Sequence, residues 1–275
     1  MARPHRLTAV SIPDTVLEEK ESPREKTAKL GVIARACAIY GVDVIEVFRD
    51  PRGRGEGVEI RRVLEYLETP QYLRKRIYPM DESLKYAGIL PPLRIPSHKP
   101  KVPIGSISVG ETREGVANAD GTVDVGLEAP ARLLGEAVPG SRVTVRISSV
   151  APLEARKAGP DEVQEYWGYR VETGSLSRVT SDDRFDVKVA TSRLGTPLEE
   201  ALGPLKSALG QAKGVKLVFG SPSRGLPDIF GDEMSKFDFV VNLYPRQEVK
   251  TVRTEEAIFA GLGLVSILSV GALGS

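Results

Sequence analysis

Residues 216–268 carry the pattern that decides the fold, in three segments: KLVFGSPSRGL (216–226), FDFVVNLYPRQEVK (237–250) and TVRTEEAIFAGLGLVSIL (251–268). The first two segments each contain an apolar strand that runs into a turn with glycine or proline. The third begins as a polar turn and continues as an apolar helix. Open α/β sheets bind ligands beyond the carboxyl ends of their strands, where such turns lie. The pattern therefore predicts a ligand site made of turns.

The rest of the chain indicates that these strands belong to a parallel α/β sheet. A helical stripe of apolar residues lies between two apolar strand candidates and stops at Gly41, a typical residue for a helix end. Strands and helices that alternate at this spacing indicate βαβ units. The expected strands are 7–12, 42–48, 168–172, 185–191, 215–219 and 239–243, and the expected helices are 27–40, 58–67, 73–77, 197–209 and 254–268.

The composition changes in the middle of the chain. Five prolines between Ile89 and Pro103 exclude regular structure inside a sheet. Short β-like runs follow, separated by an Asp-Gly and a Pro-Gly turn. We expect a small, mostly antiparallel, OB-like β-barrel at 91–164, inserted into an α/β domain made of 1–90 and 165–275. Such barrels commonly carry nucleic-acid surfaces, and a purely structural barrel explains the pattern equally well.

Composition and motif searches exclude several function classes. Lys and Arg number 38 against 37 Asp and Glu, so the net charge of +1 neither favours nor excludes nucleic acid. Two histidines and one cysteine supply no His/Cys metal cluster, and no phosphate-loop, dinucleotide-loop or GxSxG motif occurs. No apolar run approaches the length of a membrane span. We therefore expect a cytoplasmic protein that binds neither a metal nor a membrane.

The glycine turn that follows Phe219 is a candidate for backbone contact with a ligand. Gly220 and Gly225 have no Cβ, so a planar group can approach the main chain there. A second turn, 242–247, adds a proline that fixes the backbone and a polar rim. A strand followed by a glycine turn is also common ordinary structure.

Two further turns add polar side chains at the same expected edge. Thr254 is the expected N-cap of the last helix, with Glu255 and Glu256 in its first turn. The turn 191–195, TSRLG, follows a strand and places Arg193 there. Plain helix capping is the alternative explanation for the acidic residues.

The segment from Arg61 to Lys101 is locally basic, with nine Lys or Arg against four acidic residues. This excess is a signal for phosphate binding, and a solvated helix face of mixed charge explains it equally well. His98 either binds phosphate or is an ordinary loop histidine. The candidate RNA-binding residues are Arg74, Lys75, Arg76, Arg94, His98, Lys99 and Lys101.

Taken together, these motifs resemble those of the SPOUT methyltransferases. The chain is most similar to the archaeal and eukaryotic branch of RNA methyltransferases with a small barrel inserted in the SPOUT domain. The stretches that carry the resemblance, besides the three quoted above, are QYLRKRIYPMDESLKYAGILPPLRIPSHKP (71–100), EYWGYRV (165–171), ATSRLGTP (190–197) and VRTEEA (252–257). The resemblance runs from Leu7 to Leu268 and implies a SPOUT fold, whose last segment passes through a loop as a trefoil knot.

The resemblance also implies a cofactor, S-adenosylmethionine, and a homodimer in which the second protomer completes the substrate pocket. Carried over position by position, it places the cofactor against one set of residues. They are Thr191, Ser192, Arg193, Phe219, Gly220, Leu243, Tyr244, Pro245, Thr251, Val252 and Thr254.

The activity that the resemblance implies is methylation of a base in structured RNA, with uridine N3 of ribosomal RNA as one candidate. A carboxylate such as Glu255 would take the N3 proton, or a cation such as Arg193 or Arg224 would stabilise the developing anion. Ribose-methylating members carry Ser-Leu-Asn where this chain has residues 253–255, so their catalytic assignment does not transfer. The alternatives are a non-catalytic RNA-binding or assembly factor with a vestigial pocket, and a protein methyltransferase.

Overall fold

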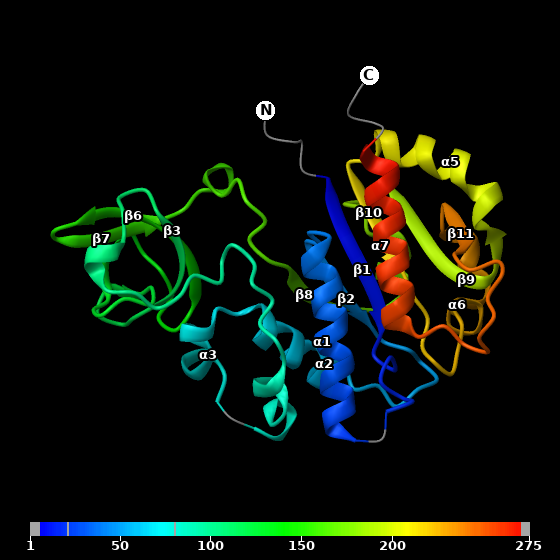
Figure 1. Cartoon of the computed structure of the whole chain (residues 1–275), viewed down its shortest axis with the longest axis horizontal. Coiled ribbons are helices and arrows are strands. Elements are labelled where there is room, and N and C mark those ends of the chain that lie inside the picture. Colours follow the sequence, from blue (N-terminus) through cyan, green and yellow to red (C-terminus); the bar gives the residue numbers. More distant parts are fainter. Residues whose placement is uncertain (1–5, 21, 80, 271–275) are drawn as a thin grey trace.

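The computed structural model describes residues 6–20, 22–79 and 81–270 of the chain. Its main body is a six-stranded sheet with the order β11-β9-β10-β1-β2-β8, in which every pairing is parallel. The parallel α/β sheet predicted from the sequence is therefore confirmed (Figure 1). The strands of this sheet are β1 (Leu7–Pro13), β2 (Val44–Phe48), β8 (Arg170–Gly174), β9 (Val187–Pro197), β10 (Gly214–Val218) and β11 (Phe239–Asn242).

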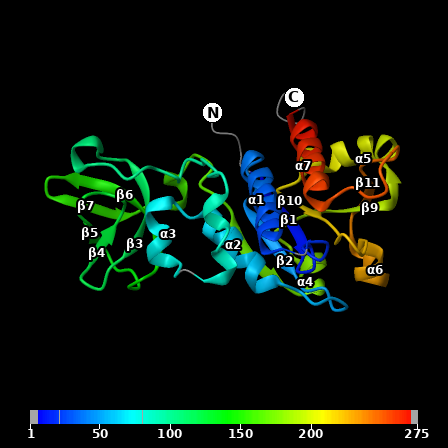
Figure 2. The same ribbon diagram turned by 60° about the horizontal axis from the view of Figure 1, so that its bottom comes forward.

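Helices cover both faces of the sheet. Figure 2 shows α1 (Pro23–Ile39), α5 (Leu198–Gln211) and α7 (Thr254–Val270) on one side, and α4 (Leu176–Ser181) and α6 (Leu226–Phe230) on the other. The largest hydrophobic core lies between the sheet and the first group of helices. The short helices α4 and α6 were not predicted, because each is too short for a hydrophobic period to show. The passage of the last segment through a loop stays a prediction.

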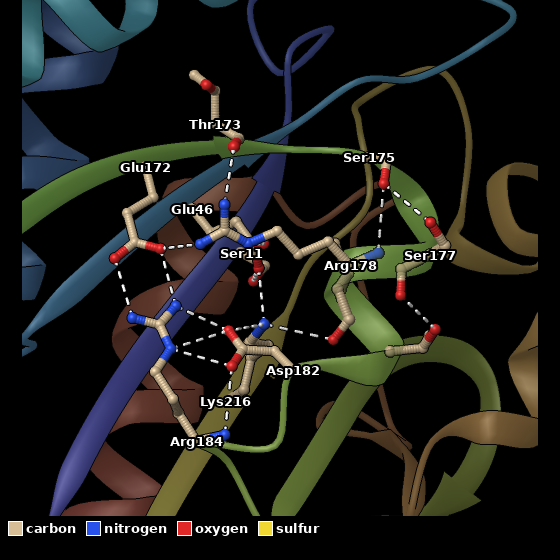
Figure 3. Close-up of polar contacts among 12 residues, drawn as sticks. Ser11, Glu46, Glu172, Thr173, Ser175, Ser177, Arg178, Asp182, Arg184 and Lys216 are labelled. Carbon is tan, nitrogen blue, oxygen red and sulfur yellow. Dashed lines mark hydrogen bonds and ion pairs between the residues drawn. The ribbon is translucent and has the colours of Figure 1, made fainter.

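An ionic cluster is buried on the face of the sheet that α4 covers (Figure 3). The Lys216 ammonium of β10 lies 2.8 Å from Glu46 Oε2 of β2 and 3.4 Å from Asp182 Oδ2. The Ser11 hydroxyl of β1 donates to the same Glu46 oxygen at 2.7 Å. These contacts join three neighbouring strands to the loop after α4, and Arg184, which pairs with Asp182, extends the cluster to Glu172 of β8. Because its charges are paired inside the protein, we assign the cluster a structural role.

The inserted region contains a closed five-stranded barrel with the order β3-β4-β5-β7-β6. All its pairings are antiparallel except β5 with β7. The turn at Gly121, where φ is +78°, joins two of its strands as predicted. The strands are β3 (Thr112–Ala117), β4 (Thr122–Asp124), β5 (Ala131–Leu134), β6 (Arg142–Val150) and β7 (Leu153–Lys157). The predicted barrel insertion is confirmed, although no separate run had indicated β5 or β7.

The barrel is attached to the sheet domain through α2 (Gly57–Glu68) and α3 (Gln71–Ile77), as Figure 1 shows. Arg142 of the barrel lies between two carboxylates, with its Nη2 3.0 Å from Glu68 Oε1 of α2. Its Nε donates to Glu114 of β3. Glu114 also accepts from the Trp167 indole and the Thr144 hydroxyl. We call the group formed by Glu68, Glu114 and Arg142 the barrel joint.

Short 3-10 turns complete the chain. They occupy Glu82–Leu84, Ala87–Ile89, Ile104–Ser106, Pro160–Glu162 and Gly231–Lys236.

Candidate functional site

A cavity of about 390 Å³ lies at the carboxyl edge of the sheet, among residues 191–194 of β9 and the turns that follow β10 and β11. This volume is within the range of small-molecule sites. The structure brings most of the predicted cofactor residues, and both candidate catalytic arginines, to its wall. Those that line it are Thr191, Ser192, Arg193, Phe219, Gly220, Arg224, Leu243, Tyr244, Thr251, Val252 and Thr254.

Side chains hold the turns against one another. The Thr191 hydroxyl donates to the Val218 carbonyl of β10 at 3.0 Å. The Asn242 amide at the end of β11 donates to the Arg193 carbonyl at 3.1 Å. The Thr254 hydroxyl at the start of α7 donates to the carbonyl of Gly220 at 3.2 Å. The cavity wall is therefore a connected structure, although its parts are more than 60 residues apart in the sequence.

The predicted turn at 191–195 is a bulge inside β9 rather than the end of a strand. The partner of β11 moves from Ala190, opposite Val240, to Thr196, opposite Val241. A Cβ on Gly195 would lie 2.6 Å from the Val240 carbonyl oxygen, so glycine permits this close crossing. The strand continues after the bulge to Pro197. The sequence had not indicated this continuation, because the glycine at position 195 is typical of a turn that ends a strand.

The expectation that Thr254 caps the last helix is wrong. Helix α7 begins at Thr254 itself, and the Glu256 carboxylate accepts from the Arg253 amide at 2.8 Å. This is the return contact of a capping box, in which the third helical residue binds the residue before the helix. The Thr254 hydroxyl is thereby free to bind Gly220 across the cavity wall.

Gly220 is needed for the geometry of the first turn. A Cβ at this position would lie 2.9 Å from the Arg224 carbonyl oxygen, which is closer than real Cβ contacts. Neighbouring Phe219 is buried and forms an apolar part of the wall. The first turn thus lines the cavity with the backbone of Gly220, while buried Phe219 supports it from the core.

The three candidate catalytic residues occupy different environments. Arg193 lines the cavity and is exposed, and the structure shows no ion pair of its guanidinium within the described ranges. The guanidinium of Arg224 is bound to protein oxygens, 2.8 Å from buried Asp50 and 3.1 Å from Glu18. Glu255 does not line the cavity.

The Glu255 side chain is directed into the protein. The residue is only 8% exposed, and its Oε2 lies 3.3 Å from the ammonium of Lys29 in α1. A carboxylate that is buried against Lys29 and lies outside the cavity wall is poorly placed to reach a ligand in the cavity.

Sequence reasoning missed a carboxylate at the cavity. Asp228 of α6 is the one acidic side chain among the described lining residues, and it is exposed. Its Oδ2 accepts from the Gly225 amide at 3.3 Å. The cationic side chain of Lys250 also lines the cavity. The sequence feature that could have revealed Asp228 is its position three residues after Gly225. An acidic residue at this spacing commonly caps the start of a helix.

A second hollow adjoins the cavity and contains the remaining predicted cofactor residue, Pro245. Tyr244 lines both spaces, and its hydroxyl donates to the Glu256 carbonyl at 3.1 Å. Burial raises the pKa of Tyr244 above its usual value. The phenol is therefore neutral at physiological pH and serves as a wall of the site.

The predicted RNA-binding residues divide into two groups. Arg74 donates from Nε to the Thr69 carbonyl at 2.8 Å and from Nη2 to the Leu67 carbonyl at 3.0 Å. His98 Nε2 contacts the Glu68 carbonyl at 2.7 Å. These side chains hold the end of α2 in place. The remainder are Lys75, Arg94 and Lys101, which are exposed, Lys99, which is half-buried, and Arg76, which is paired with Asp124.

No group of three or more His, Cys, Asp or Glu side chains in the described part of the chain is placed to hold a metal ion. No helix in residues 6–20, 22–79 or 81–270 has the length and apolar character that a membrane span requires.

Comparison with known proteins adds an independent line of evidence. The sequence profile of the family described as "Putative RNA methyltransferase" matches residues 8–265. An uncharacterized protein of Haloarcula marismortui is 36% identical, over 94% of this chain and 99% of its own length. The human protein named "28S rRNA (uridine-N(3))-methyltransferase" is 33% identical, over 94% of this chain and 77% of its own.

The mouse protein of the same name is also 33% identical, over 94% of this chain and 76% of its own length. Among solved structures, an RNA 2′-O ribose methyltransferase aligns over 98% of this chain and 59% of its own, with a TM-score of 0.41 and 10% identity. The family profile covers nearly the whole chain and includes both the cavity and the barrel. The chain therefore belongs to the RNA methyltransferase family of that description, and the resemblance predicted from its motifs is confirmed.

Proposed function

We propose that this protein transfers a methyl group from S-adenosylmethionine to a base of structured RNA, namely N3 of a uridine in ribosomal RNA. The observation that carries the proposal is the cavity whose wall contains nearly all the residues that the resemblance assigned to the cofactor. The names of the human and mouse relatives supply the base and the class of RNA.

The cavity suits S-adenosylmethionine in size and in chemistry. Its volume of about 390 Å³ is that of a small-molecule site, and Phe219 and Leu243 give it apolar walls. Gly220 lines the cavity with backbone alone, which a planar ring can approach closely. When bound, S-adenosylmethionine supplies an activated methyl group, so the protein has chiefly to align the acceptor and exclude water.

The charged side chains of the wall have distinct roles in this proposal. A uridine N3 must lose its proton before or during attack, and the negative charge that develops spreads onto the neighbouring oxygens. Arg193 is the exposed cation that stabilises this charge. Asp228 is the lining carboxylate that accepts the proton. Arg224 acts through Asp50 and holds the first turn in place.

The test is transfer of radiolabelled methyl groups to RNA from cells that lack this gene, with RNA from wild-type cells as control. Label in the deletion RNA alone, recovered as N3-methyluridine, is the expected result. Another labelled nucleoside would disprove the assignment to N3. Label in a protein of the extract, with none in RNA, would show a protein methyltransferase.

A homodimer belongs to the same proposal. The outer faces of α1 and α7 expose Val32, Ile39 and Ile267, and the last of these is 73% exposed. Helix α7 is apolar on nearly all sides, which is typical of a helix that is buried in the assembled protein. Sedimentation equilibrium should give twice the mass of the chain, and Ile267→Glu should reduce it to one chain.

A further inference from the structure

The loop between β2 and α2 lies at the same sheet edge as the cavity and has the sequence RDPRGRGE (49–56). Three of its residues, Arg49, Arg52 and Arg54, are exposed. In the described ranges no ion pair involves any of these three guanidinium groups. The loop therefore presents three guanidinium groups to solvent.

The alternation of glycine and arginine has a physical cause. A Cβ on Gly53 would lie 2.1 Å from Thr15 Cγ2 and 2.5 Å from Arg224 Nη2, and one on Gly55 would lie 1.8 Å from Asp14 Oδ2. A Cβ at either position would therefore force the neighbouring side chains to move. The two glycines thus allow the loop backbone to pack closely against Asp14 and Thr15, and Arg54 between them is exposed to solvent.

The loop is also fixed to the wall of the cavity. The buried carboxylate of Asp50 lies 2.8 Å from the Arg224 guanidinium, and it accepts from the Thr15 hydroxyl at 3.1 Å and from the Arg52 amide at 3.0 Å. Arg224 is itself a lining residue of the cavity. The position of the arginine loop is therefore set by the same contacts that hold the first turn of the site.

Carboxylates close to the loop are already engaged. Glu18 lies 3.1 Å from Arg224, and Glu56 lies 2.6 Å from the ammonium of Lys26. Asp14 accepts from the Asp50 amide at 2.9 Å. The charges of Arg52 and Arg54 are thus left for a partner outside the chain.

We infer that Arg52 and Arg54 form a phosphate-binding loop, which holds the RNA backbone beside the nucleotide that enters the cavity. This inference rests on the proposed function for the identity of the partner. Arginine suits phosphate because its planar guanidinium donates two parallel hydrogen bonds. A loop fixed at the rim of the cavity would hold the strand next to its target nucleotide.

The test compares the wild type with the R52A/R54A variant on an in vitro transcript of large-subunit ribosomal RNA. RNA affinity is measured over a range of salt concentrations, together with kcat and KM for methyl transfer. The slope of log affinity against log salt should become shallower by about 1.5, which corresponds to two lost phosphate contacts. The KM for RNA should rise by about tenfold, and calorimetry should show unchanged affinity for S-adenosylmethionine.

Two further variants serve as controls. K206A/K213A removes two exposed cations far from the cavity, on α5 and just before β10, and should leave the salt slope unchanged. R52K/R54K retains the charges and should restore most of the slope. A folding defect in R52A/R54A would also weaken the binding of S-adenosylmethionine that calorimetry measures, so it can be distinguished from a loss of RNA binding alone.

An unchanged salt slope and KM in R52A/R54A would overturn the inference. A change in sedimentation mass without a change in RNA binding would also overturn it, because the arginines would then contact a second copy of the chain. If the wild type bound RNA through these arginines but methylated none, the proposed activity would fail and the phosphate loop would stand.

Discussion

The barrel joint and the carboxyl edge of the sheet use arginine for opposite purposes. In the joint, Arg142 lies between Glu68 and Glu114, and its hydrogen-bonding groups are occupied by the protein. At the sheet edge, Arg54 and Arg193 are exposed, and no ion pair of either is seen in the part of the chain that the structure describes. The first arrangement fixes one domain on another, and the second leaves charge for a ligand.

The difference shows that the number of cations in a segment does not tell how many of them are available to a ligand. The segment from Arg61 to Lys101 has the larger excess of positive residues, yet Arg74 is bound to backbone carbonyls. The loop 49–56 is shorter, yet its arginines are unpaired among the described residues. What decides is whether the guanidinium already has oxygen partners inside the protein.

The largest expected effect is on stability and comes from the joint. Arg142→Ala leaves the buried carboxylates of Glu68 and Glu114 without their counter-charge, so the free energy of unfolding should fall by about 3–5 kcal/mol. Urea denaturation measures this fall. The matched control is Arg54→Ala, which removes an exposed guanidinium and should change stability by less than about 0.5 kcal/mol. Equal losses in the two variants would abolish the distinction between the regions.

The next effect is on activity and comes from the cavity. Gly220→Ala forces the first turn to move, because the new Cβ would lie 2.9 Å from the Arg224 carbonyl oxygen. We expect methyl transfer to fall by about 100-fold, the cost of a small displacement of an aligned reactant, with RNA affinity unchanged. Gly203→Ala on α5 is the control, since a Cβ there meets nothing within 4 Å. A parallel loss of RNA affinity would contradict a separate cofactor role for the turn.

Adjacent residues of α3 allow the sharpest comparison of bound and unbound cations. Arg74→Ala removes two hydrogen bonds to carbonyls and should cost about 2 kcal/mol of stability without changing the salt slope of RNA binding. Lys75 is exposed, so Lys75→Ala should leave stability unchanged and lower that slope by about 0.7. Denaturation and salt-dependent binding of both variants test this. If Arg74→Ala lowered the salt slope and left stability unchanged, Arg74 would belong to the RNA-binding surface after all.

The sequence predicted the order of the main strands and helices because burial on both faces leaves long apolar runs in a parallel sheet. It also predicted the turns that form the cavity, since glycine and proline mark them. It could not show that Glu255 faces Lys29 or that Arg224 faces Asp50. Those contacts join residues far apart in the sequence, and a list of residue types contains no information about which carboxylate a cation meets.

The smallest expected effect is a pH dependence of the joint, and it comes from His98. Its Nε2 lies 2.7 Å from the Glu68 carbonyl, and burial lowers the pKa of His98 below the usual 6.5. As the pH falls from 6.5 towards that lower pKa, the unfolded chain takes up a proton before the folded one does. The stability linked to neutral His98 is therefore present above pH 6.5 and is lost as the pH falls through the lower, folded-state pKa.

His98→Gln keeps a hydrogen-bond donor for the Glu68 carbonyl but cannot be protonated. The variant should therefore lose less stability than the wild type between pH 7 and pH 5, as measured by urea denaturation at each pH. The comparison must be made as a difference between the two proteins, because burial also raises the pKa of Glu68 to about 7. Glu68 titrates in the same range with the opposite sign and is present in both chains. Superimposable pH profiles would show that His98 is protonated as readily in the folded joint as in the unfolded chain.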